Sequence, residues 1–205
     1  ERYDRHFFVA NLLSNRQLRD PNLVTLVQAA IERYRLPPES LQLEICESSL
    51  IDAPEAVVTA LNGLRRSGVR VGLDDFGTGH SSLGHIRRVP FDSMKLDRAL
   101  MADLYTDPWA QGVTSAVLAM ARAMKIRAVS DGVEDAATVQ MLQALGCEEI
   151  QGLYVAKPMK ARDFEEWLED GGPALLARKY HNEISGDQVI AGLGDATTIA
   201  KWASN

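Results

Sequence analysis

The sequence predicts an α/β fold built on a parallel sheet or barrel. Two observations support this: short apolar strand patterns alternate with helical apolar patterns along most of the chain, and the connections between them are short. A third is that polar or ionisable residues recur where the predicted strands end, which is where (β/α) barrels carry their chemistry. With 205 residues, 46% of them hydrophobic and 24% charged, the chain is long enough for one full core.

The most informative stretch is a predicted strand over residues 69–73 that ends at two adjacent carboxylates, Asp74 and Asp75. Residues 77–82 contain two glycines and two serines, which predict a sharp turn into a helix. Two neighbouring buried charges are costly unless a cation or hydrogen-bond donors compensate them. The alternative interpretation is that the aspartates cap the next helix.

The other elements follow from hydrophobic periodicity and from proline and glycine stops. Further strands are predicted at residues 7–13, 41–46, 91–96, 126–129 and 149–155. Helices are predicted from Pro21 to just before Pro37, from Asp52 to Gly68, and over residues 81–88, 109–124, 136–145 and 163–168. Residues 1–170 are expected to form a barrel domain. Residues 171–205, which are small, polar and rich in glycine, are expected to form an appendage with one more helix near its end.

Composition narrows the classes of function. The formal net charge of -6 argues against binding to a nucleic acid polymer or an anionic membrane, which requires a basic face. No apolar run approaches the roughly 20 residues that span a bilayer, and the first residues are too charged for a secretory signal. Cys46 and Cys147 each lie in an apolar strand-like segment, which favours buried free thiols in a reducing cytoplasm over a disulfide.

Carboxylates dominate the residues at the predicted strand ends, and Glu44 and Lys95 lie within strands that ought to be buried. The full set is Glu44, Asp74, Asp75, Lys95, Asp97, Asp131, Glu134 and Gln151. No histidine or cysteine spacing suits a metal, so oxygen ligands and a hard cation such as Mg²⁺ or Mn²⁺ are expected. Pairs of such ions commonly act on phosphodiesters. Singly, each residue also has a structural interpretation: Glu47 could cap a turn, and Gln151 could satisfy a backbone amide.

Five motifs resemble, in order and spacing, those of the EAL-domain family of bacterial cyclic di-GMP phosphodiesterases and their inactive relatives. They are L-E-I-C-E-S, V-G-L-D-D-F-G-T-G-H-S-S-L, M-K-L-D-R, S-D-G-V-E-D and Q-G-L-Y-V-A-K-P, and the resemblance covers roughly residues 7–168. It implies a modified TIM barrel, two divalent ions and hydrolysis of one phosphodiester bond of cyclic di-GMP to the linear dinucleotide. It also implies that the first strand-helix unit of the barrel, with the family's name-giving glutamate, lies before residue 1.

The resemblance assigns roles residue by residue. Glu44 and Asp74 resemble metal ligands, Asp75 a ligand of the second metal that also contacts substrate, and Lys95 the residue that orients the attacking water. Asp131 and Glu134 match the two acids of the family's A-E-G-V-E motif and are expected to act in catalysis. Gln151 and Pro158 are expected near the substrate, and Glu47 resembles the acid that steadies the loop after D-D-F-G.

Two departures from the family pattern stand out. The family's V-N-L-S-x-R-Q asparagine aligns without a gap on Leu12, which cannot bind a metal, and Asn11 takes the role only if the strand carries an extra residue. The first acid of A-E-G-V-E is Asp131, one methylene shorter, and a shift of about 1 Å in a catalytic group can cost a hundredfold in rate.

Three hypotheses follow. The chain is a phosphodiesterase domain with slow or no turnover, or a degenerate EAL domain that binds cyclic di-GMP or a protein partner without cleaving it. The third is a barrel lyase or aldolase using Lys95 as a Schiff base, which would require an apolar pocket around a lysine that the sequence surrounds with acids. An open barrel edge is a pairing hazard, so residues after Gly171, a second copy in a homodimer or another domain should cover it.

Overall fold

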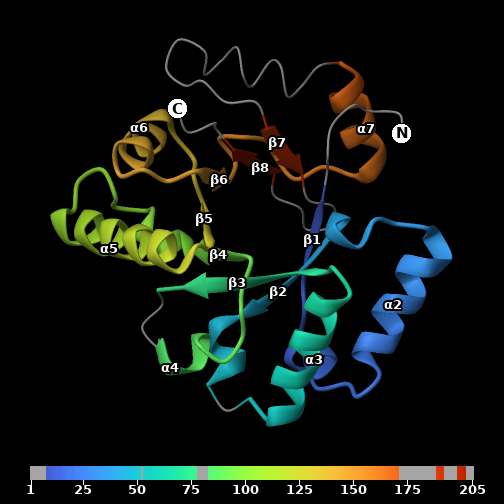
Figure 1. Ribbon diagram of the computed structural model, residues 1–205. Coiled ribbons are helices and arrows are strands. Elements are labelled where there is room, and N and C mark those ends of the chain that lie inside the picture. Colours follow the sequence, from blue (N-terminus) through green and yellow to red (C-terminus); the bar gives the residue numbers. More distant parts are fainter. Residues whose placement is uncertain (1–7, 52, 78–82, 171–187, 192–197, 202–205) are drawn as a thin grey trace. The chain divides into compact units, whose positions relative to one another are not determined.

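The computed structural model describes residues 8–51, 53–77, 83–170, 188–191 and 198–201 (Figure 1). It divides into two units, Glu1–Lys95 and Leu96–Asn205, and each is described in turn. Strands and helices alternate along both, which confirms the predicted α/β class. The turn predicted from Gly79, Ser81 and Ser82 lies outside the described residues.

The first unit is built on a sheet whose strands follow the order of the sequence. The strands are β1 (Val9–Leu12), β2 (Leu41–Cys46), β3 (Arg70–Phe76) and β4 (Ser93–Leu96). β1 pairs with β2, and β2 with β3, in parallel. Residues 41–46 form β2 as predicted, because apolar Leu43 and Ile45 alternate with polar neighbours. Both apolar side chains are buried.

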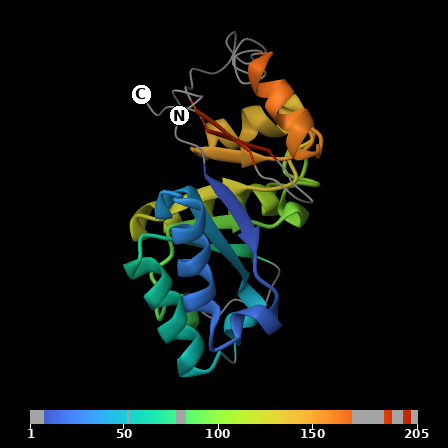
Figure 2. The same ribbon diagram turned by 90° about the vertical axis from the view of Figure 1, so that its right-hand side faces the viewer.

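Helices and short 3₁₀ turns connect these strands. The helices are α1 (Asn15–Leu18), α2 (Leu23–Tyr34), α3 (Glu55–Arg66) and α4 (Leu83–Ile86), and the 3₁₀ turns are η1 (Pro38–Ser40) and η2 (Glu47–Leu50). α2 ends where Arg35 takes a left-handed conformation shortly before Pro37, and α3 begins directly after Pro54. Figures 1 and 2 show α2 and α3 side by side on the same face of β1–β3. α3 buries Leu61 and Leu64 completely in the core.

The second unit combines a parallel strand pair with an antiparallel pair. Its elements are η3 (Arg98–Leu100), α5 (Pro108–Met124), β5 (Arg127–Ser130), α6 (Ala136–Ala144), β6 (Glu149–Gln151), α7 (Ala161–Glu169), β7 (Gln188–Ala191) and β8 (Thr198–Lys201). β5 and β6 are parallel, whereas β8 joins β6 in the antiparallel sense and β7 pairs with β8. None of the helices in the described part of the chain has the length and apolar character required to cross a membrane.

Two sequence-based expectations about the later part of the chain are wrong. The helix expected near the end is replaced by β8, whose Ile199 lies opposite Gln151, so strand pairing overrides the local pattern. The strand expected over residues 149–155 ends at Gln151, because Gly152 begins a turn. Both cysteines are free, as predicted. The prediction that both are buried is confirmed for Cys147 and wrong for Cys46, which is half-buried.

Asp92, just before β4, connects three parts of the first unit. Its carboxylate accepts two hydrogen bonds from the Arg65 guanidinium of α3, at 3.0 and 2.6 Å, and a third from the Val71 backbone N–H of β3, at 2.8 Å. In return the Asp92 N–H donates to the Val71 carbonyl, at 2.8 Å. A bidentate Arg–carboxylate pair is geometrically specific, so Asp92 fixes α3 and the start of β4 against β3.

Replacing Asp92 with alanine should therefore destabilise the protein. We expect a loss of about 1–3 kcal/mol of unfolding free energy, because Arg65 and the Val71 N–H lose a half-buried acceptor. Urea denaturation measures this loss. The matched control is Glu55→Ala, which removes the exposed ion pair with Arg88 and should change the free energy by less than about 0.5 kcal/mol. Equal losses in the two variants would contradict the assignment.

Candidate active site

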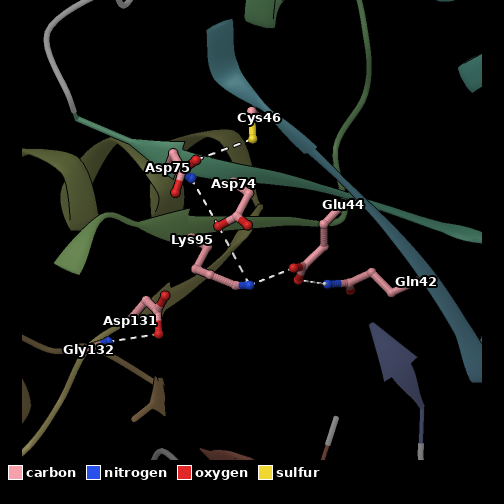
Figure 3. A network of polar contacts seen from close by, with 8 residues as sticks. All are labelled: Gln42, Glu44, Cys46, Asp74, Asp75, Lys95, Asp131 and Gly132. Atoms are coloured by element: carbon pink, nitrogen blue, oxygen red, sulfur yellow. Dashed lines mark hydrogen bonds and ion pairs between the residues drawn. The ribbon is translucent and has the colours of Figure 1, made fainter. Parts of the chain in front are cut away.

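A buried polar cluster lies on one face of the first unit's sheet, at the carboxyl ends of the strands. Glu44 of β2 is in register with Gly72 of β3, and Asp74 of β3 with Cys46. Alternation along each strand therefore places Glu44 and Asp74 on the same face, away from Leu43 and the helices. Lys95 comes from β4 and reaches both carboxylates (Figure 3).

The cluster is organised around the Lys95 ammonium. Its Nζ lies 2.5 Å from Glu44 Oε2 and 3.6 Å from Asp74 Oδ1. The three residues are each less than a tenth exposed, at 7%, 5% and 8% for Lys95, Glu44 and Asp74. A buried carboxylate without a cation would be strongly destabilising, so Lys95 is what permits both acids to be buried here. These ion pairs also favour the charged ammonium form, which is not the nucleophile that a Schiff-base mechanism requires.

The negative charge of the buried Asp74 carboxylate is only partly compensated by its neighbours. Burial raises the pKa of the Asp74 carboxyl from 3.8 to about 6; Lys95 opposes this shift, and the nearby Glu44 and Asp75 add to it. Asp74 Oδ1 also accepts a hydrogen bond from the Asp75 N–H, at 3.0 Å. The site therefore carries an excess of negative charge that one lysine does not neutralise.

Asp75 points elsewhere. Its backbone is in the left-handed region, with φ 58°, an uncommon conformation that aspartate tolerates better than most residues. Its Oδ2 accepts a hydrogen bond from the Cys46 thiol at 3.2 Å (Figure 3). Burial, the bond to Asp75 and the charge of Asp75 together raise the pKa of Cys46 to about 12, so this thiol stays protonated.

Glu47 opens η2 and is 4% exposed. Neither of its carboxylate oxygens has a hydrogen-bond partner within the described part of the chain. A buried acid of this kind requires a donor. The loop after D-D-F-G that the resemblance pairs with Glu47 lies outside the described residues, so its stabilising role stays a prediction.

The register of β1 shows which of Asn11 and Leu12 lies on the same face of the sheet as Glu44. Leu12 pairs with Glu44, whereas Asn11 pairs with Leu43. Laterally paired residues of parallel strands share a face of the sheet, so Leu12 is on the side of Glu44 and Asn11 on the side of the helices. Leu12 is 47% exposed and offers no oxygen at the position where the family pattern expects a ligand.

Asp131, Glu134, Gln151 and Pro158 belong to the second unit. Asp131 follows β5; its N–H donates to the Leu96 carbonyl at 3.1 Å, and its carboxylate accepts from the Gly132 N–H at 2.8 Å (Figure 3). Gln151, the last residue of β6, is 6% exposed, whereas Glu134 and Pro158 are exposed.

Backbone bonds join the loops that follow β5 and β6. The Val133 N–H donates to the Gln151 carbonyl and the Tyr154 N–H to the Val133 carbonyl, each at 3.0 Å. Gly152, with φ 152°, lies so close to the Val133 backbone that a Cβ there would overlap its N, C and O atoms. Glycine at this position is therefore required for the loop that carries Glu134 to pack against the chain where it leaves β6 after Gln151.

The residues of the first unit fit a hard divalent cation in their chemistry. Glu44 and Asp74 both direct an oxygen at the same cationic group, Lys95 Nζ, and the local charge is negative. No three histidine, cysteine, aspartate or glutamate side chains among the described residues form a complete metal cage. Mg²⁺ commonly takes only one or two carboxylates, and water and substrate phosphates supply its remaining ligands.

Two contacts of this cluster did not figure among the predicted site residues. Gln42 donates to Glu44 within the cluster, and Cys46 donates to Asp75. Both follow the period-two alternation of β2 from Glu44, so that pattern was the signal that could have identified them.

Comparison with known proteins places this geometry in context. The family model described as EAL domain matches residues 3–158. The cyclic di-GMP phosphodiesterase PdeR of Escherichia coli is 35% identical over 161 residues, which are 78% of this chain and 24% of PdeR. The EAL domain of Mycobacterium smegmatis DcpA superposes with a TM-score of 0.76 and 34% identity, covering 80% of this chain and 73% of that domain.

The structure of the MucR phosphodiesterase of Pseudomonas aeruginosa in complex with c-di-GMP superposes with a TM-score of 0.72 and 35% identity, covering 77% of this chain and 64% of that one. The chain spans 20–24% of the length of the curated relatives that it matches first.

The raised pKa of Asp74 predicts how stability depends on pH in the absence of divalent metal. The folded state keeps a proton that the unfolded state releases, so the unfolding free energy should fall as pH rises from about 4 to about 6. A shift from 3.8 to about 6 corresponds to about 3 kcal/mol in total. Urea denaturation at several pH values with a chelator measures the slope. Asp74→Asn should remove it, and the exposed-site control Asp103→Asn should keep it. Equal slopes in wild type and Asp74→Asn would contradict the prediction.

Proposed function

The chain belongs to the EAL-domain family, and from that premise we propose that it binds cyclic di-GMP and hydrolyses one of its phosphodiester bonds. The observation that carries the proposal is the buried Lys95–Glu44–Asp74 cluster at the carboxyl ends of parallel strands. A relative that is a cyclic di-GMP phosphodiesterase and a related structure that holds c-di-GMP support the choice of substrate.

The family's phosphodiesterases are metal-dependent, and we propose Mg²⁺ or Mn²⁺ for this chain because the donors are oxygens. Glu44 and Asp74 would hold one ion, and Asp75 would contribute to a second. When bound, such ions activate water for attack and neutralise charge on the phosphate.

The protein's own residues would orient water and substrate, offset charge on the phosphate and exchange protons. Lys95 brings a fixed positive charge to a buried cluster, where it can orient a water and offset charge that develops on the phosphate. Gln151 offers a buried amide for a guanine edge or a metal-bound water. Asp131 and Glu134 are proposed to exchange protons and to orient substrate.

Leu12 favours a second candidate function, that of a receptor which binds cyclic di-GMP without efficient cleavage. The leucine lies level with Glu44, where the family pattern expects an amide ligand. The residues of the second unit that are proposed to contact substrate, Gln151 and Pro158, are the same with or without this leucine. Binding can therefore persist while turnover is slow.

Location and assembly are also proposals. Two free thiols suit a reducing cytoplasm. Among the described residues β1 pairs only with β2, so its other edge is available to a second copy or another domain. The segment after Gly171 supplies β8, which pairs with β6 instead.

The function is tested by assaying cyclic di-GMP hydrolysis with Mn²⁺ beside a binding titration. We expect binding together with turnover roughly a thousandfold below that of a fully liganded site, because a missing ligand removes several kcal/mol of transition-state stabilisation. Glu44→Ala should abolish what hydrolysis remains. Fast hydrolysis by the wild-type chain that Glu44→Ala abolishes would contradict the slow-turnover prediction. No binding of cyclic di-GMP at all would contradict both candidate functions.

The register of β1 gives a matched pair of variants. Leu12→Asn should tighten Mn²⁺ binding by roughly tenfold, about 1.4 kcal/mol, because it adds an amide oxygen on the face of Glu44. Asn11→Leu should leave Mn²⁺ affinity unchanged, because residue 11 is level with Leu43 on the opposite face. Calorimetry measures both. The reverse result, with affinity lost in Asn11→Leu and unchanged in Leu12→Asn, would show that Asn11 is the ligand.

A further inference from the structure

Gln42 lies directly behind the predicted metal ligand Glu44. The two residues are separated by one position on β2, so their side chains project from the same face of the sheet. Gln42 is 1% exposed, and its Nε2 donates a hydrogen bond to Glu44 Oε1 at 3.0 Å (Figure 3). The other oxygen of Glu44, Oε2, is bound by Lys95. Each oxygen of this carboxylate therefore has its own donor.

The absence of a side chain at Gly72 creates the space for this arrangement. Gly72 is in register with Glu44, and a Cβ there would lie 2.9 Å from Ser93 Oγ, 3.0 Å from Gln42 Nε2 and 3.2 Å from Glu44 Cγ. Three side chains from β2 and β4 thus crowd the α carbon of Gly72. The amide of Gln42 is confined from the β3 side and cannot readily turn away from Glu44.

Burial of an amide at this position has a cost that packing alone does not explain. A leucine or methionine of similar size would fill the space without losing hydration, whereas a buried amide must be compensated by hydrogen bonds. Because Gln42 is neutral, it can donate to Glu44 without a further positive charge that would compete with a cation. If the amide turned its oxygen toward the carboxylate, two acceptors would face each other.

We propose that Gln42 is a positioning residue for metal binding: it fixes the plane of the Glu44 carboxylate so that Oε2 is presented to the cluster of Lys95 and Asp74. This inference rests on the proposed function, since it concerns the residue that orients one of its metal ligands. Groups that orient metal ligands typically contribute 10- to 100-fold to metal affinity. Gln42 acts through Glu44 and has no predicted contact with substrate.

The test is Mn²⁺ and Mg²⁺ binding by calorimetry on the full chain, with unfolding measured in parallel without metal. Gln42→Met keeps the length of the side chain and removes the donor, and it should weaken metal binding by 10-fold or more. A Gln42→Met variant that folds and binds both ions as the wild type does would overturn the proposal.

Two controls separate positioning from general destabilisation. Leu43→Ala, on the opposite face of β2, should lower stability by about 2–5 kcal/mol and leave metal affinity unchanged. Ser93→Ala touches the same Gly72 space but keeps the donor, and it should bind metal as the wild type does. If Leu43→Ala weakens metal binding as much as Gln42→Met does, stability rather than positioning explains the loss, and the proposal is wrong.

A measurement on the wild-type chain covers the case in which Gln42→Met does not fold. The side-chain amide signals of Gln42 in a ¹H–¹⁵N spectrum should shift on titration with Mg²⁺. Those of Gln17, whose side chain accepts from the Ser14 N–H in the capping box of α1, should not. Unshifted Gln42 signals at saturating Mg²⁺ would overturn the proposal. If Glu44→Ala abolishes metal binding and Gln42→Met does not, this inference alone fails. If the wild-type chain binds no divalent metal, the proposed function fails with it.

Discussion

The ion pairs of Lys95 with Glu44 and Asp74 are the constraint on which the rest of the first unit depends. Three ionisable side chains are buried on three neighbouring strands, and each is tolerable only while the others are in place. The register of β2 against β3 and the position of β4 therefore matter more here than in an ordinary apolar sheet, since a slip of one residue would turn a charge toward the helices.

Contacts around the cluster fix the register of these strands and the position of β4. Asp92 joins α3 to β3 at the start of β4, so the strand that carries Lys95 is held at its beginning. Gly72 lets three polar side chains approach closely beneath the carboxylates. The raised pKa of Asp74 shows that compensation is still incomplete, which is typical of sites arranged for a ligand rather than for stability.

The parts of this molecule that follow a local pattern could be predicted from the sequence. β2 alternates cleanly, and its predicted bounds are those of the structure. The two acids at the end of β3 are assigned to the site because polar residues recur at the predicted strand ends, and this assignment stays a prediction. Pairing between strands could not be predicted in this way: that Leu12 is level with Glu44, or that Ile199 lies opposite Gln151, depends on tertiary register. The left-handed backbone of Asp75 and its contact with Cys46 on a neighbouring strand could not be predicted either, because neither follows from the local alternation of β3.

Gly152 allows the chain after β5 and the chain after β6 to pack backbone against backbone. The N–H and the carbonyl of Val133 both form backbone hydrogen bonds with the segment around Gly152, and the Val133 backbone contacts the glycine directly. The two loops are therefore linked to each other through their backbones. A displacement of Gln151 would therefore reach Val133, the neighbour of Glu134, through the backbone, with no relay of side chains between them. The spacing of the two strand ends is thus set by the backbone and by the absence of a Cβ at residue 152.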